Sequence, residues 1–137
     1  MNPQLEIYLK MRQEYGLPDL VGCSTEEINH LEQYFHVRLP ALYKEYLWYF
    51  GEEDVQRINK FQALIDELLS EDPIIILPRD AFIFYFDNYD SVFFFQTDTS
   101  ERDPPIYICI ISTGKIMMWN KSFTEYLIDS MENRKRD

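Results

Sequence analysis

Two aromatic-rich runs separated by a short polar turn constrain this chain most. Residues 81–86 read AFIFYF, and residues 91–96 read SVFFFQ. Aromatic and β-branched residues favour strands, whereas the DNYD sequence at 87–90 is typical of a turn. We therefore predict an antiparallel β-hairpin whose loop is formed by residues 87–90.

A second hairpin and a closing helix follow. The apolar runs at 106–111 and 115–119 flank a turn sequence centred on Gly114. Beyond them, Ser122 and Glu125 have the spacing of a capping box, in which the serine caps a helix and the glutamate returns to its amide. The sequence thus predicts at least four strands, mainly antiparallel, and a C-terminal helix.

The first hairpin is apolar on both of its faces. Phe82, Phe84 and Phe86 alternate with Ile83 and Tyr85, where a half-buried sheet would alternate apolar with polar residues. Either helices cover both faces, or part of one face is an exposed aromatic surface for a partner. Coverage is favoured because the chain has enough candidate helices to supply it.

The first third of the chain is predicted to be helical. A rough apolar stripe over residues 4–11 indicates a helix that ends before Gly16. Ser24 opens a second helix with a capping box, and Pro40 is expected at the first position of a third helix that ends at Gly51.

Residues 52–77 give a weaker pattern. The acidic sequence at 52–54 is expected to be a solvated loop, and the apolar spacing at 59–69 predicts a further amphipathic helix. The run at 74–77 fits either a strand or a buried connector.

Together these elements predict an α+β fold over residues 1–137, a single domain. The N-terminal helices pack on a mainly antiparallel sheet of at least four strands, and a C-terminal helix closes the structure. Cys23 and Cys109 lack the spacing of a disulfide framework or a zinc site. No leader-like or membrane-spanning run is recognised, so a cytoplasmic location is expected.

The net charge of −11 is concentrated in the middle of the chain. Residues 45–103 hold fourteen acidic side chains against four basic ones. Such a surface repels phosphate and anionic lipid, so nucleic-acid and membrane binding are disfavoured, and a basic protein partner is favoured. The alternative is that the acidity only maintains solubility.

Catalytic and metal-binding patterns are weak. His30 and His36 are not spaced as a metal-binding pair on a helix, and the four glycines stand singly, without a phosphate-binding loop. We expect no catalytic residue, no metal and no cofactor. Scattered carboxylates leave a small carboxylate-dependent hydrolase as the least favoured alternative.

The helix pair at 24–51 carries a family resemblance. An apolar helix containing Leu31 is followed by the Leu39-Pro40 step and by a second helix with Tyr43, Leu47 and Phe50. With the strands and the final helix, this order resembles the SUKH superfamily over roughly residues 23–131. That superfamily includes bacterial immunity proteins and a fungal regulator of cell-wall synthesis. One glycine of the usual pair after the second helix is replaced here by Glu52.

The resemblance implies an immunity protein that binds and neutralises a cognate polymorphic toxin. An acidic loop surface would suit a basic toxin domain such as a nuclease, and a non-toxin regulator or scaffold module is the alternative. The residues predicted to bind the partner are acids in expected turns or at strand ends, with two aromatic anchors: Glu52, Glu53, Asp54, Asp87, Asp90, Asp98, Glu101 and Asp103, with Tyr49 and Tyr89.

Overall fold

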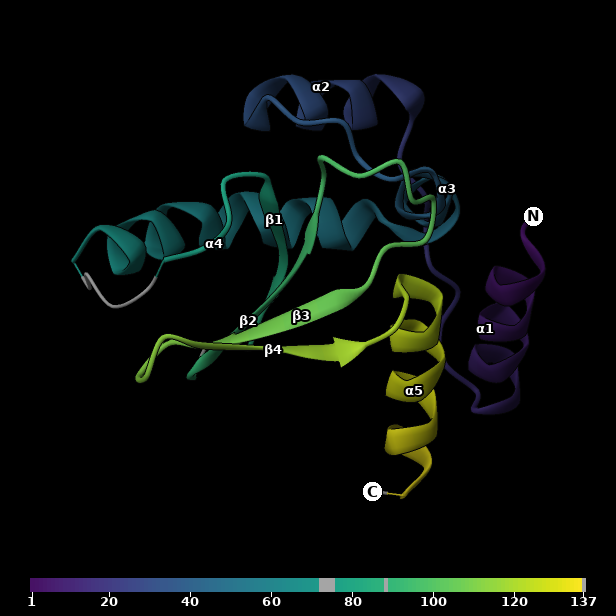
Figure 1. Cartoon of the computed structure of the whole chain (residues 1–137). Coiled ribbons are helices and arrows are strands. Elements are labelled where there is room, and N and C mark those ends of the chain that lie inside the picture. Colours follow the sequence, from purple (N-terminus) through teal and green to yellow (C-terminus); the bar gives the residue numbers. More distant parts are fainter. Residues whose placement is uncertain (72–75, 88, 137) are drawn as a thin grey trace.

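The computed structural model describes residues 1–71, 76–87 and 89–136, and within them an α+β fold is confirmed (Figure 1). Helices precede the sheet and one helix follows it. The elements in chain order are α1 (Pro3–Glu14), α2 (Thr25–Phe35), α3 (Ala41–Phe50), α4 (Glu52–Glu71), β1 (Ala81–Phe86), β2 (Ser91–Gln96), β3 (Ile106–Ile110), β4 (Lys115–Asn120) and α5 (Phe123–Arg136).

The sheet is an antiparallel meander in the order β1-β2-β3-β4. Both predicted hairpins are present, and β1 and β2 have the predicted bounds. An irregularity between Ile83 and Tyr85 leaves Phe84 as the extra residue in β1. The burial of β1 still alternates, with Phe82, Phe84 and Phe86 buried and the residues between them partly exposed.

Tyr43 on α3 lies at the centre of the core. Its ring is 4.9 Å from that of Phe95 on β2 and 5.1 Å from that of Phe123 on α5, measured between centroids. Phe82 and Phe84 of β1 contact the same ring. These aromatic contacts bring α3 and α5 onto one region of the sheet.

The other helices frame this core. α1 packs beside α5, although the two are the first and last helices of the chain (Figure 1), and α4 packs against β1. Within the described part of the chain, no helix is both long enough and apolar enough to cross a membrane.

Three local predictions about helix starts need correction. Residues 52–54, expected to be a loop, form the first turn of α4. Acidic side chains are stabilised there by the positive end of the helix dipole. Pro40 is the N-cap of α3 and not its first helical residue. At α5, the Glu125 carboxylate accepts from the amide of Lys121, so only the Ser122 half of the predicted capping box forms.

The run at 74–77 lies partly outside the described residues, since residues 72–75 are not described. Ile76 and Leu77 belong to no strand. Gly51 follows the last residue of α3, as predicted, and there is no room for a side chain at this position. A Cβ atom there would lie 2.5 Å from the Cα of Leu47, so the close approach of the backbone requires glycine.

Candidate functional site

The ten residues predicted to bind a partner lie at three separate places. Tyr49 and residues 52–54 lie at the junction of α3 and α4, residues 87, 89 and 90 form the β1–β2 turn, and residues 98, 101 and 103 lie in the β2–β3 connection. The turn and the connection are at opposite ends of β2, a strand of six residues that spans roughly 20 Å. The structure therefore does not join these acids into the single acidic loop surface that the sequence suggested.

At the α3–α4 junction, one acid points inward and its neighbour outward. Asp54 accepts a short hydrogen bond from the Tyr46 hydroxyl, and its Oδ1 lies 3.8 Å from a guanidinium nitrogen of Arg57. Burial raises the pKa of the Asp54 carboxyl above its usual value. The Glu53 carboxylate is exposed and lies 4.0 Å from the same guanidinium.

In the β1–β2 turn the two acids have structural roles. One carboxylate oxygen of Asp87 accepts from the amides of Tyr89, Asp90 and Ser91 at 2.9–3.1 Å. Asp90 accepts from the Ser112 amide at 2.8 Å and from its hydroxyl at 2.6 Å, which ties the two hairpin turns together. The side chain of Tyr89 projects from this turn and is 90% exposed.

The β2–β3 connection is similarly divided. Asp103 accepts from the amide and the hydroxyl of Thr124 and so caps the start of α5. Asp98 and Glu101 are exposed and project from the loop. Of the ten residues, the acids that project outward are thus mainly Glu53, Asp98 and Glu101.

A pocket that sequence reasoning missed lies between α1, α3, α4 and α5. It has a volume of about 400 Å³, and its walls include four tyrosines from three helices, Tyr8, Tyr43, Tyr46 and Tyr126. We call it the tyrosine pocket. No local signal in the sequence could have identified it, because its walls come from helices at opposite ends of the chain.

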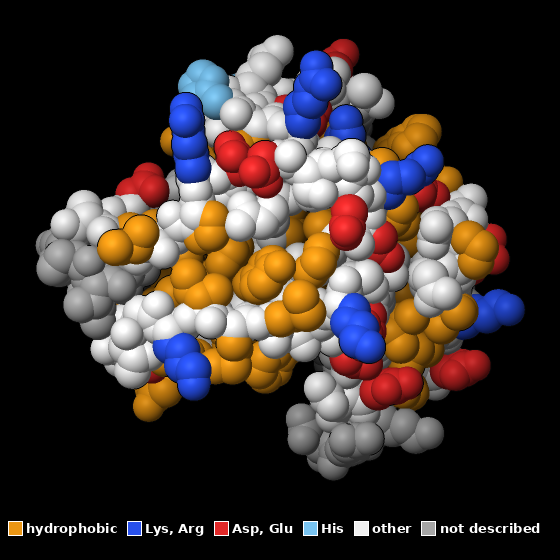
Figure 2. All heavy atoms as spheres, in the orientation of Figure 1, with side chains coloured by type: hydrophobic (Ala, Val, Ile, Leu, Met, Phe, Trp, Pro, Cys, Tyr) orange, Lys and Arg blue, Asp and Glu red, His pale blue; other side chains and the backbone are white. Residues whose placement is uncertain are grey.

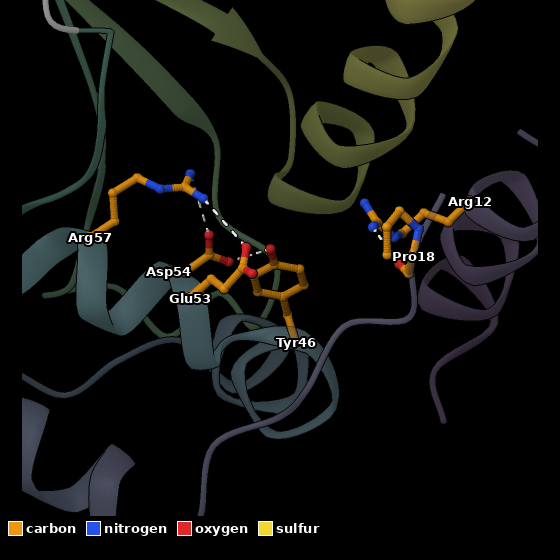
Figure 3. Close-up of polar contacts among 6 residues, drawn as sticks. All are labelled: Arg12, Pro18, Tyr46, Glu53, Asp54 and Arg57. Atoms are coloured by element: carbon orange, nitrogen blue, oxygen red, sulfur yellow. Dashed lines mark hydrogen bonds and ion pairs between the residues drawn. The ribbon is translucent and has the colours of Figure 1, made fainter. Parts of the chain in front are cut away.

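The tyrosine pocket is lined by charges of both signs. Figure 3 shows Glu53, Asp54 and Arg57 grouped beside Tyr46 on one side and Arg12 on the other. The guanidinium of Arg12 lies 5.9 Å from the centre of the Tyr8 ring. It also donates to the Pro18 carbonyl oxygen at 2.9 Å.

One buried hydroxyl in the tyrosine pocket is unpaired. Tyr43 is 1% exposed, and its hydroxyl has no hydrogen-bond partner among the described residues. Burial raises the pKa of this phenol well above its usual value, so the group stays neutral. A buried polar atom without a partner is costly, so this hydroxyl lowers the stability of the fold.

The second candidate feature is the edge strand β4. Four successive large apolar side chains on it, Ile116, Met117, Met118 and Trp119, are between 37% and 53% exposed. The coverage that we favoured concerned the first hairpin, where the residues of β1 are buried or partly buried, so the exposed row belongs to the second hairpin. In Figure 2 apolar side chains gather across the middle of the molecule, over the region where Figure 1 places the sheet.

Metal chemistry has no support in the described residues, where no group of three or more histidine, cysteine or carboxylate side chains is placed to hold an ion. Both candidate features have groups suited to recognition. The tyrosine pocket offers ring faces, hydroxyls and carboxylates, and β4 offers an apolar row with a free edge.

Comparison with known families agrees with this arrangement. The family model described as SMI1 / KNR4 family (SUKH-1) matches residues 22–129, which is most of the chain. The chain belongs to the SMI1/KNR4 family. No curated protein matched the chain significantly.

The SMI1/KNR4 match covers the whole of β4 but only part of the tyrosine pocket. It includes β4 and the residues that carried the resemblance, such as Leu47 and Phe50, which are buried core residues. α1 lies outside the matched residues, yet it supplies Tyr8 and Arg12 to the tyrosine pocket. One wall of the pocket is therefore an addition to the part that matches the family.

Proposed function

We propose that this SMI1/KNR4 domain is an immunity protein that binds and neutralises a cognate polymorphic toxin. The bacterial members of the superfamily that the sequence resembles include immunity proteins that act in this way. The observation that carries the proposal is the exposed apolar row on β4. A folded acidic protein that leaves such a row uncovered is suited to bind another protein there.

The partner on β4 is a different protein and not a second copy of this chain. Two molecules that each carry a net charge of −11 repel one another. Lysines at 115 and 121 flank the exposed row, and charged residues on an edge strand oppose its pairing with a copy of itself.

The charge favours a basic partner, and a nuclease is the toxin class that we infer. Nucleases bind phosphates through basic surfaces, so a strongly acidic protein is steered toward them. The outward acids Glu53, Asp98 and Glu101 would contribute to this steering even though they do not form one surface.

The proposal is tested by co-expressing the chain with each toxin-like domain found among the proteins encoded near it. Wild-type protein should restore growth. The double variant Ile116→Gln and Met118→Gln, which makes two alternate positions on β4 polar, should fold with a loss of about 0.5 kcal/mol per substitution and bind at least about tenfold more weakly.

The matched control is Ile7→Gln with Leu64→Gln, which changes two exposed apolar residues on α1 and α4. This control should bind as wild type does. If both double variants bind equally well, β4 is not the interface. If the wild-type chain binds a protein that is not a toxin and gives no protection, the regulator or scaffold function replaces the immunity function.

A carboxylate-dependent hydrolase is the competing function, and one observation favours it. Asp54 lines the tyrosine pocket and has a raised pKa, as general acids often do. Its carboxylate, however, is held by Tyr46 and faces Arg57, and hydrolysis with two carboxylates needs a second one across the substrate. An Asp54→Asn variant that binds the toxin but no longer protects would support the hydrolase.

A further inference from the structure

The tyrosine pocket has the features of a binding site and not of a packing fault. Its volume of about 400 Å³ is within the range of roughly 300–1,000 Å³ that is usual for ligand sites. Packing faults in protein cores are few and are mostly apolar. This pocket instead has charged side chains in its walls, among them the partly exposed carboxylate of Asp54.

The lining of the pocket favours a cation. Its carboxylates are Asp19, Glu53 and Asp54 and its cations are Arg12 and Arg57, so the lining carries one more negative than positive charge. The faces of tyrosine and phenylalanine rings are electron-rich and attract cations as well.

The molecule itself provides an example of the contact. Arg12 already places its guanidinium over the face of Tyr8 at the wall of the pocket. A guanidinium is planar, stacks on aromatic rings and presents several donors, which suits a site that combines ring faces with oxygen acceptors. Tyr43, Asp54 and Tyr126 offer such rings and oxygens deeper in the pocket.

We propose that the tyrosine pocket binds the guanidinium of an arginine side chain supplied by the protein partner. The carboxylate of Asp54 would accept its hydrogen bonds, and the rings of Tyr46 and Tyr126 would contact its faces. The identity of the donor rests on the proposed function, since an immunity protein that meets a basic toxin encounters many arginines. The chemistry of the pocket does not depend on that function.

The test is an NMR titration of the purified chain at pH 7 with N-acetyl-arginine amide. The expected result is a saturable shift of signals from residues of the pocket, including Tyr46 and Tyr126. The citrulline analogue has the same shape without the charge and should bind at least about tenfold more weakly, because hydrogen bonds to charged groups are the stronger ones.

One variant locates the contact. Asp54→Asn should weaken binding of the arginine probe about tenfold, since it removes the charged acceptor. Asp66→Asn, an exposed acid on the same helix, is the matched control and should leave binding unchanged.

Several results would overturn the proposal: no saturable shift with wild-type protein, equal binding of the citrulline analogue, or preferential binding of benzoate as a test anion. The titration requires no toxin. A chain that neutralises its toxin but does not bind the arginine probe would therefore disprove this proposal while leaving the proposed function in place.

Discussion

Tyr43 and Tyr46 lie one helical turn apart on α3, yet their hydroxyls have opposite roles. Tyr46 donates to Asp54 and so satisfies a buried carboxylate. The hydroxyl of Tyr43 has no partner in the described structure and contributes nothing to folding that its ring does not already provide. At the residue scale, the structure thus separates a hydroxyl that stabilises the fold from one that does not.

This difference predicts opposite effects of two similar substitutions on the free energy of unfolding. Tyr43→Phe should leave stability unchanged or raise it, because it removes an unsatisfied buried group. Tyr46→Phe should cost about 1–3 kcal/mol, because it leaves the carboxylate of Asp54 buried without its donor. Urea denaturation followed by circular dichroism measures both, and equal losses would contradict the assignment.

At the scale of elements, the strands were the easiest part to predict. Aromatic runs on either side of residues 87–90 specified the first hairpin because strand propensity and turn chemistry agree there. The start of α4 was missed because an acidic sequence after Gly51 fits a loop as well as a first helical turn. The exposure of β4 was also missed, since an apolar run does not reveal which strand lies at the edge of the sheet.

The start of α5 depends on a residue that is distant in sequence, Asp103. Replacing it with alanine should destabilise the protein by about 1 kcal/mol, because the amide and hydroxyl of the buried Thr124 lose their acceptor. Asp98→Ala, in the same connection but exposed, should change stability by less than about 0.5 kcal/mol. Thermal unfolding of both variants checks this, and equally small effects would show that Asp103 does not cap the helix.

At the scale of the whole molecule, the positions of the acids in the sequence did not predict where they lie in the fold. The acids dense in residues 45–103 were expected to form one surface, but folding places them at opposite ends of the sheet and uses several as caps or turn acceptors. The tyrosine pocket arises only when α1 packs beside α5, a contact between the two ends of the chain. Sequence patterns are local, so neither outcome was readable from them.

The net charge remains a property that a partner experiences at a distance, while β4 and the tyrosine pocket act at contact. In this account, acidity accelerates the encounter, the apolar row supplies buried area, and the pocket holds one basic side chain. Each of these contributions is a form of binding, so the chain would act by covering a surface of its partner.

The most direct measurement of this central claim is a titration of the purified toxin domain with the purified chain while the toxin's own activity is followed. The account predicts that activity falls to zero near one equivalent, and that association slows as salt is raised because the attraction is screened. Full toxin activity in the presence of excess chain would contradict it.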